Sequence, residues 1–244
     1  MRQEEYRKMF KLEDSHWWFT AKRLFAREFL KQVKPRFAKI LDVGCGTGRN
    51  LLMLKEFGQT YGVDINPLAL KFCSQRGQKQ VKLGGAESLP FTDNSFDLVT
   101  IFDVLYHRGV SSDLQVLKEA FRVIKPGGYL LVNDCAYQWL FGPHDRAMQA
   151  RQRYSRQELK GKITAAGFKI RRASYTNMFM FPLFLFNRLI KKMNNSVYSS
   201  DVDSLPSWLN RLLINVSRIE TSLLRLMDLP IGSSIMVLAQ KLKT

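Results

Sequence analysis

One run constrains the fold of this chain more than any other: Ile40-Leu41-Asp42-Val43-Gly44-Cys45-Gly46-Thr47-Gly48. Its first residues suit a buried strand, its glycines suit a tight turn, and a helical pattern starts at Arg49. Glycine lets the chain turn sharply and lets a ligand approach the backbone without a Cβ atom in the way. The run therefore predicts a strand, a turn that binds a nucleotide-like cofactor, and a helix, in that order.

The rest of the chain extends this pattern. Residues 38–135 alternate between strand-like and helix-like segments, which is typical of a mostly parallel sheet with helices on both faces. The pair Ser155 and Glu158 has the spacing of a capping box and opens a helix that ends at Gly167. The predicted strands are 38–43, 59–64, 80–83, 96–102, 129–133, 169–175 and 233–242, and the main predicted helices are 49–56, 67–76, 113–124, 155–166 and 212–227.

We therefore predict an α/β fold, Rossmann-like and doubly wound, with a mostly parallel seven-stranded sheet and an antiparallel final strand. A length of 244 residues suits one domain spanning residues 1–244. Its expected parts are an N-terminal helical cap at 1–35, a cofactor-binding core at 36–137, and substrate-side insertions with the closing strands at 138–244. The last part includes a helical insertion before the final strand.

The net charge of +17 is concentrated in one part of the chain. Residues 146–200 carry twelve Lys or Arg residues and a single acid, Glu158. A basic segment indicates an anionic neighbour, and nucleic acid, anionic lipid and a phosphate-bearing substrate are the candidates.

The cysteines and the opening residues bear on cellular location. Cys45, Cys73 and Cys135 are few, odd in number and not spaced as metal ligands, so we expect neither a disulfide framework nor a metal site. The opening residues, MRQEEYRKMF, lack an apolar signal core. These features predict a cytoplasmic protein.

The glycine spacing separates two classes of cofactor. A dinucleotide fingerprint needs glycine three positions after its second glycine, where this chain has Arg49, and glycine falls at position 48 instead. The run resembles motif I of class I methyltransferases that use S-adenosylmethionine (SAM), of the type 11 kind. The resemblance implies that Asp42 serves the methionine ammonium and that Asp64 binds the ribose hydroxyls. The other implied cofactor residues near this turn are Gly44, Cys45, Gly46, Gly48 and Ile65.

Later segments match the same family in order, and the resemblance covers about residues 36–137. The segments 85–91 and 93–99 resemble the adenine-side loop and the fourth strand, so Ala86 and Glu87 are expected to border the adenine. Residues 117–128 resemble the motif in which a proline-glycine turn leads into strand five. Asp103 is expected near the methyl group, with Tyr106 as a substrate contact. His107 is either a catalytic base or a structural or binding residue.

Two segments outside the core carry candidate substrate residues. His16, Trp17 and Trp18 resemble the HWWF segment of a bacterial branch often associated with glycan or lipid-linked biosynthesis, where it should close over the cofactor; a buried cap helix is the alternative. Residues 144–155 resemble a basic, tyrosine-ended segment of the same branch, although Ala150 and Gln152 depart from its pattern. Its candidate substrate residues are Arg151, Arg153 and Tyr154, and a solvated basic face is the alternative.

The most apolar run, from Met178 to Met193, has an uncharged part too short to span a bilayer. It suits either a core or dimer contact, or an interfacial helix flanked by Arg188, Lys191 and Lys192.

The sequence as a whole predicts a SAM-dependent methyltransferase acting on a small molecule, such as a sugar, an isoprenoid or a lipid-linked precursor. An apolar segment beside cationic residues suits an amphiphilic acceptor, with peripheral contact at the inner face of a membrane. RNA or protein methylation is an alternative motivated by the charge, but the chain has no Asn-Pro-Pro-Tyr motif after strand four, which disfavours nucleic acid. A binding or scaffold protein without catalysis is the remaining alternative.

Overall fold

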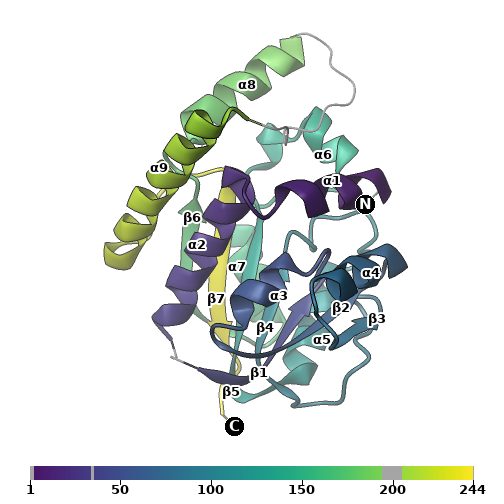
Figure 1. Ribbon diagram of the computed structural model, residues 1–244. Coiled ribbons are helices and arrows are strands. Elements are labelled where there is room, and N and C mark those ends of the chain that lie inside the picture. Colours follow the sequence, from purple (N-terminus) through teal and green to yellow (C-terminus); the bar gives the residue numbers. More distant parts are fainter. Residues whose placement is uncertain (1–2, 34–35, 194–204, 244) are drawn as a thin grey trace.

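A computed structural model describes residues 3–33, 36–193 and 205–243 of the chain. Its centre is a seven-stranded sheet in the order β3-β2-β1-β4-β5-β7-β6 (Figure 1). Among the described strands, β7 alone runs in the direction opposite to all the others, so the predicted sheet is confirmed. The strands are β1 (Phe37–Val43), β2 (Gly58–Asp64), β3 (Val81–Leu83), β4 (Phe96–Phe102), β5 (Ile124–Cys135), β6 (Lys169–Thr176) and β7 (Ser234–Gln240).

Several helices begin where the sequence offers a side-chain cap. Asn66 accepts a hydrogen bond from the backbone N–H of Leu68, and Ser155 with Glu158 forms the predicted capping box. The helices are α1 (Gln3–Leu12), α2 (Trp17–Lys31), α3 (Arg49–Leu54), α4 (Pro67–Gln75), α5 (Asp113–Val123), α6 (Pro143–Ala147), α7 (Arg156–Ala165), α8 (Phe181–Met193) and α9 (Ser207–Leu226), with a short 3-10 turn, η1, at Gln138–Leu140.

Two boundaries differ from the prediction by more than two residues. Strand β5 starts at Ile124 instead of 129, because the stretch from Lys125 to Gly128 continues along the sheet as an irregularity in register, where Gly127 donates a hydrogen bond to the Lys241 carbonyl. Helix α9 starts at Ser207, directly after Pro206, instead of at 212. Both differences come from pairing or packing with distant segments.

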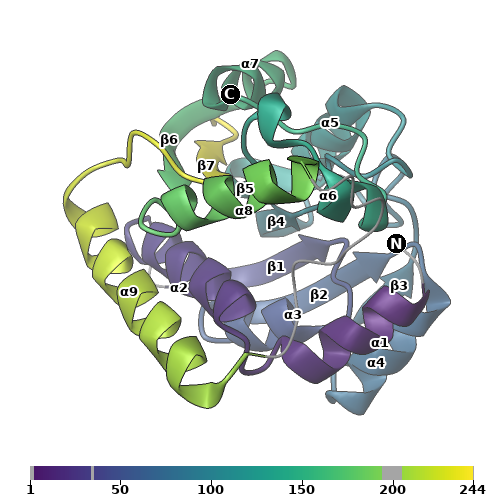
Figure 2. The same cartoon turned by 90° about the horizontal axis from the view of Figure 1, so that it is seen from above.

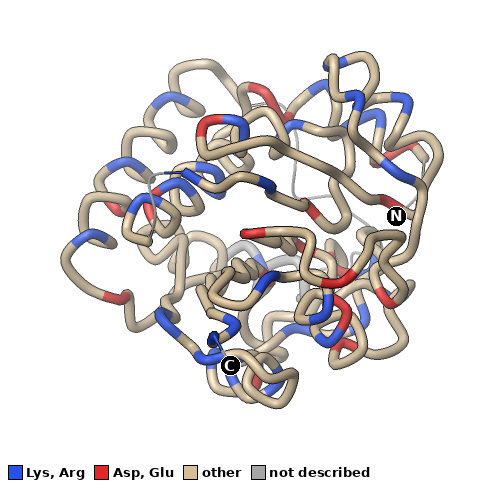
Figure 3. Tube along the Cα trace, turned by 90° about the horizontal axis from the view of Figure 1, so that it is seen from below, with Lys and Arg blue, Asp and Glu red and all other residues tan. Residues whose placement is uncertain are grey.

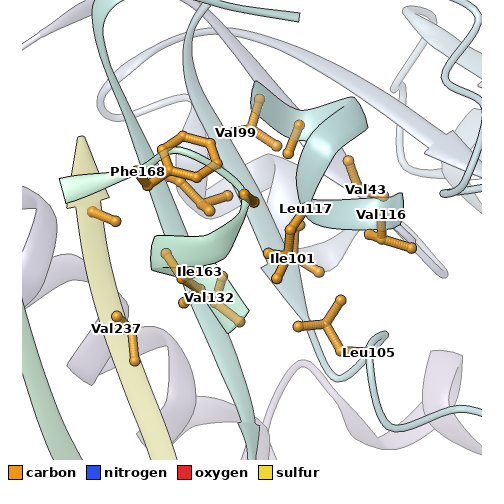
Figure 4. Packing of buried hydrophobic residues seen from close by; sticks show 14 of the residues in the cluster. Val43, Val99, Ile101, Leu105, Val116, Leu117, Val132, Ile163, Phe168 and Val237 are labelled. Atoms are coloured by element: carbon orange, nitrogen blue, oxygen red, sulfur yellow. The ribbon is translucent and has the colours of Figure 1, made fainter. Parts of the chain in front are cut away.

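Each face of the sheet buries its own apolar cluster. On one face, β-strand residues such as Ile101 and Val132 pack against Leu117 of α5 and Ile163 of α7 (Figure 4). On the other face, α2, α3 and α9 contribute to a second cluster. Alternation of side chains along the strands divides the core in this way.

The carboxyl ends of the parallel strands meet at one edge of the sheet, and α1, α6 and α8 lie over this edge (Figures 1 and 2). In such sheets ligands bind outside the carboxyl ends of the strands, where the order reverses. Here the order reverses between β1 and β4. This edge is therefore the place to look for a site.

The apolar run from Met178 combines features of both alternatives considered for it. Phe181 is buried, whereas Leu183 and Phe186 of α8 are exposed. Arg188 is buried and lies 3.5 Å from an Asp145 carboxylate oxygen. The side chains of Lys191 and Lys192 lie outside the described residues.

Candidate active site

The glycine turn between β1 and α3 has the geometry that its sequence predicts. Gly44, Gly46 and Gly48 all have positive φ, at 71°, 54° and 84°. A Cβ atom on Gly44 would lie 2.4 Å from Val104 Cγ2, and one on Gly46 would lie 3.0 Å from Met9 Cε. Gly44 therefore needs glycine on grounds of conformation and of space, whereas Gly46 needs it on grounds of conformation, because the flexible end of Met9 can move.

Asp42 ends in the interior beside this turn, at the carboxyl end of β1. The Thr100 hydroxyl donates to its Oδ1 at 2.6 Å, while its buried Oδ2 has no hydrogen-bond partner among the described residues. Burial raises the pKa of this carboxyl to about 7; the Thr100 hydrogen bond opposes the rise and the charge of Asp64 adds to it. A buried acceptor without a donor is costly, so Asp42 is suited to a cationic or N–H ligand group.

Asp64, at the end of β2, has donors on both oxygens. The backbone N–H of Gly46 donates to Oδ2 at 2.9 Å, and the N–H of Asn66 donates to Oδ1 at 2.9 Å. The Tyr6 hydroxyl of α1 also donates to Oδ1, at 3.1 Å. A carboxylate can accept about four hydrogen bonds, and a side-chain hydroxyl is the donor that a ribose hydroxyl could replace or join.

The cap reaches the glycine turn through the segment after α1, which sequence reasoning missed. Glu13 is buried, accepts a short hydrogen bond from the Thr47 hydroxyl and lies 3.1 Å from an Arg76 nitrogen. Burial raises the pKa of Glu13 to about 7, against the lowering effect of Arg76. Asp14 pairs with Arg76 at 2.9 Å and with Arg49 at 2.7 Å. The adjacent acids of the cap were the available signal.

Asp103 follows β4 and has a left-handed backbone, with φ of 57°. Lys22 of α2 forms a close ion pair with its Oδ2, and the Asn133 side chain donates to Oδ1 at 3.2 Å. Lys22 also lies over the Trp18 ring, with its Nζ 5.8 Å from the ring centroid. A strained non-glycine residue at the end of a strand is a feature of functional sites.

A second buried acid, Asp134, lies beside Asp103 and was also missed. It accepts a hydrogen bond from the backbone N–H of Tyr106 at 3.3 Å. Burial, and then the charge of Asp103, raises the pKa of Asp134 well above its ordinary value. Burial likewise raises the pKa of the Tyr106 hydroxyl. Perturbed groups gathered at one edge indicate a site, and the Asn133-Asp134 pair at the end of a predicted strand was the signal.

His107 lies on the same loop, and its pKa is lowered to about 4 because the ring is partly buried. Its Nδ1 accepts the backbone N–H of Gly109 at 3.0 Å, which leaves the proton of a neutral ring on Nε2. A general base works best with a pKa near the working pH and a free lone pair. The geometry therefore favours the structural or binding role over the base role.

The other predicted cofactor residues, including the two expected to border the adenine, differ in how far they are buried. Ile65 directly follows Asp64 and is 71% exposed, and Ala86 is half-buried against the core. The Glu87 carboxylate accepts hydrogen bonds from the Ser111 hydroxyl and the Ser112 N–H, both at 2.8 Å. These bonds hold its pKa low although burial opposes the shift. Glu87 thus braces the loop before α5.

The aromatic segment of the cap begins α2. His16 is buried and serves as its N-cap, where Nδ1 accepts the Trp18 N–H at 3.3 Å. The N–H of Trp17 donates to the Asn210 side chain of α9 at 2.8 Å, and its ring packs against the core. The described contacts of His16 and Trp17 therefore match a packed cap helix, and Glu13 and Tyr6 lie closer to the glycine turn.

The basic segment before α7 is used internally. Arg153 has 3% of its side chain exposed and pairs with Asp145 at 2.8 Å, while Arg151 pairs closely with Asp113. The buried Tyr154 hydroxyl lies 2.9 Å from an Asp113 oxygen and 3.0 Å from the Leu105 carbonyl oxygen. A solvated basic face is wrong for Arg153, and these partners clamp the loop that carries Asp103 and His107. Any substrate contact by these three residues stays a prediction.

Comparisons with known proteins find relatives of the core of this chain. A family model described as a methyltransferase domain matches residues 41–132. A demethylmenaquinone methyltransferase of Geobacillus stearothermophilus is 44% identical over 114 residues, which are 43% of this chain and 48% of the relative. The relative of the same name in Bacillus licheniformis is 40% identical over 116 residues. The matches thus span about half the length of these curated relatives.

Solved structures extend the likeness to the fold of the whole chain. A SAM-dependent methyltransferase of Thermotoga maritima has a TM-score of 0.60 and 20% identity over 98% of this chain and 95% of its own. The [4+2]-cyclase SpnF has a TM-score of 0.58 and 20% identity over 91% and 81%. Such identities show the fold alone, and the fold also serves another reaction. The family match, in contrast, covers the glycine turn and both carboxylates. Residues 41–132 of this chain therefore match a methyltransferase domain, in a chain that has the fold of SAM-dependent methyltransferases.

Proposed function

We propose that the whole chain is a SAM-dependent methyltransferase that acts on a small molecule. The observation that carries the proposal is the pair of buried carboxylates beside the glycine turn, of which Asp42 has an oxygen without a described partner. The methionine ammonium would supply that donor, and the ribose hydroxyls would bind Asp64 in place of, or together with, the Tyr6 hydroxyl. The exposed Ile65 and the half-buried Ala86 are suited to cover the adenine.

The protein's own contribution to the reaction is placement and exclusion of water. SAM supplies a methyl group already activated by its sulfonium. Lys22 holds Asp103 in one orientation, and the Tyr106 N–H does the same for Asp134. An oxygen acceptor would also have to lose a proton, but Asp134 is fully buried with a backbone N–H on each oxygen, and His107 has its Nδ1 occupied, so neither side chain is positioned to take that proton in this arrangement. Carbon or sulfur acceptors would need less of this help.

The acceptor is proposed to lie between the cap at 1–35 and the substrate-side part at 138–244, as parts of a single domain with the core at 36–137. The name of the matched relatives supports a small molecule and makes demethylmenaquinone the first acceptor to assay. Sugars, isoprenoids and lipid-linked precursors are the other classes. Contact of residues 178–190 with a lipid-linked acceptor belongs to the proposal, because Leu183 and Phe186 of α8 are exposed.

A lipid-linked acceptor would place the protein in the cytoplasm, attached peripherally to the inner face of a membrane, and this location is part of the proposal. No helix among residues 3–33, 36–193 and 205–243 is long and apolar enough to cross a membrane. In the same ranges no group of three His, Cys, Asp or Glu residues could hold a metal ion.

Titration calorimetry of SAM into the purified chain tests the proposal, with NAD as the control ligand and Asp64→Ala as the variant. We expect saturable SAM binding, at least about tenfold weaker in Asp64→Ala because hydrogen bonds to a charged group are lost. Transfer of a labelled methyl group to demethylmenaquinone is then assayed with the wild type. Absence of SAM binding by well-folded protein would overturn the proposal in favour of a scaffold, and binding without transfer to any small acceptor would favour RNA or protein substrates.

A further inference from the structure

Helix α9 has an outer face that nothing in the described chain covers. The helix forms the outermost layer on one side of the molecule, with α2 between it and the sheet (Figures 1 and 2). Its inner face is buried through Leu213, Ser217 and Leu224. Its first turn is fixed to the cap, because the Asn210 side chain bonds the Trp17 N–H and the Ser15 carbonyl. The helix is thus held rigidly with one side open to solvent.

Large apolar side chains form a row along this outer face. Trp208, Leu212, Ile219 and Leu226 are 65%, 51%, 58% and 83% exposed. At about 100° per residue these positions lie within about 40° of one another, and the row is about 27 Å long. Single exposed apolar residues are ordinary on a protein surface, but an aligned row of this length marks an interaction surface.

Arginines form a second row beside the apolar one. Arg211, Arg218 and Arg225 recur every seven residues, which keeps them on one flank of the helix, and Figure 3 shows basic positions along the whole of α9 at the edge of the molecule. Arg225 lies 3.0 Å from Glu28 but stays 59% exposed. Arg211 and Arg218 have no acidic partner among the described residues. Arg211 donates a hydrogen bond to the Ser207 carbonyl, and Arg218 donates one to the Asn215 side chain.

Acidic groups are missing from this face within the described residues. Glu220, the one acid of α9, is buried and accepts the backbone N–H of Phe179. Asp228, beyond the helix, pairs with Arg172 at 2.6 Å. An apolar row with a tryptophan at its end, flanked on one side by arginines and free of exposed acids, has the chemistry of a helix that lies in the interface of an anionic membrane.

We infer that the outer face of α9 docks the protein on an anionic lipid surface. The apolar row would enter the boundary between headgroups and acyl chains, and the arginines would contact lipid phosphates. The apolar row distinguishes this occupant from nucleic acid, whose backbone offers arginine a partner but leaves leucine and isoleucine exposed. A second copy of the chain would bring no exposed acid from its own α9 to pair with the arginines.

The biological role of this membrane contact rests on the proposed function, because an enzyme with an amphiphilic acceptor has to meet that acceptor at a membrane. The contact itself does not depend on catalysis. Vesicle binding and SAM binding are therefore measured separately, so that failure of one leaves the other standing.

Co-sedimentation of the full chain with vesicles tests the inference, comparing phosphatidylcholine alone with a mixture containing about one third phosphatidylglycerol. We expect binding to the anionic vesicles only. Arg211→Gln/Arg218→Gln should weaken it about ten- to thirtyfold through lost electrostatic attraction. Trp208→Ser/Ile219→Ser should weaken it at least about tenfold through lost apolar burial. The matched control, Lys118→Gln/Lys160→Gln, removes equal charge from exposed positions on α5 and α7 and should change it less than about twofold.

Hydrogen exchange with and without vesicles locates the contact, and protection is expected on α9. Equal loss of binding in the control pair, or protection on α8 in place of α9, would overturn the inference. So would no binding to anionic vesicles by protein that binds SAM. A concentration-dependent dimer without vesicles that Trp208→Ser/Ile219→Ser disrupts would assign the face to a second copy. Retention on nucleic acid, but not on vesicles, that requires Arg211 and Arg218 would assign it to nucleic acid.

Discussion

Two charged clusters lie at the carboxyl edge of the sheet, and they differ in where their partners come from. Asp42 has a carboxylate oxygen without a described partner. Asp64 accepts a hydrogen bond from the Tyr6 hydroxyl, which a ligand could replace. The arginines Arg151 and Arg153 are bound by acids of the same chain. Charge in a sequence thus indicates a ligand site where the fold leaves an acceptor free, as at Asp42, or fills it with a donor that a ligand could replace, as at Asp64.

The largest expected effect is on the arginine cluster, from Arg153→Met. Removal of one member of a buried ion pair leaves Asp145 short of its partner, so the free energy of unfolding should fall by about 3–5 kcal/mol. Arg151→Met, at a pair with a third of the arginine side chain exposed, should cost about 1 kcal/mol or less. Urea denaturation measures both. If Arg153→Met kept full stability and raised only the KM for the acceptor, Arg153 would belong with the ligand-binding residues.

In the glycine turn beside Asp42 and Asp64, Gly44→Ala tests whether the backbone of the turn contacts the cofactor. The new Cβ would lie 2.4 Å from Val104 Cγ2 at a positive φ, so the turn must shift, and SAM affinity should fall about a hundredfold. The control is Gly161→Ala, where nothing lies within 4 Å of the new Cβ in the middle of α7. That change should leave SAM binding intact and raise stability by up to about 1 kcal/mol. Unchanged SAM affinity in Gly44→Ala would remove the turn from the cofactor site.

The protonation state of Asp42 should make both the stability of the protein and its affinity for SAM depend on pH. The pKa of the Asp42 carboxyl is about 7 in the folded chain, above its ordinary 3.8, so the fold favours the protonated form. The stability that the protein gains from this proton is therefore lost as the pH rises from about 4 to 7. The free energy of unfolding of Asp42→Asn, measured relative to the wild type, should therefore be higher at pH 8 than at pH 4. Because an ammonium ligand needs the ionised form, SAM affinity should fall about tenfold per pH unit below 7.

Calorimetry in buffers of different ionisation enthalpy checks the proton balance of Asp42. Near neutral pH the wild type should release a proton on binding SAM, and Asp42→Asn should not. Proton release that persists in the variant would assign the titration to another group, of which Glu13 has a pKa in the same range.

The smallest expected effect is at Tyr6. Tyr6→Phe removes the hydroxyl that donates to Asp64 and should tighten SAM binding about three- to tenfold, while costing about 1 kcal/mol of stability without SAM. Tyr154→Phe removes a buried hydroxyl of the arginine cluster and should lower stability by a similar amount without tightening SAM binding. Weaker SAM binding in Tyr6→Phe would mean that the hydroxyl contacts the cofactor directly.

The sequence anticipated most of the sheet because its signals are local. The strand and helix periodicities, the Ser155–Glu158 capping box and the glycine turn each act within a few residues, and all appear where predicted. The boundaries that moved, at β5 and α9, depend on pairing with β7 or on packing against the cap, which no local pattern encodes.

By itself, then, the sequence determined the order of elements, the core that matches a methyltransferase domain and the two carboxylates beside the turn, since these follow from residue type and short spacing. The tertiary structure alone decided which charges are satisfied internally. The contacts of Tyr6 with Asp64, Lys22 with Asp103 and Arg153 with Asp145 depend on how separate helices and strands pack together. A side chain's availability for a ligand is a property of its neighbours in space, and those neighbours come from all parts of the chain.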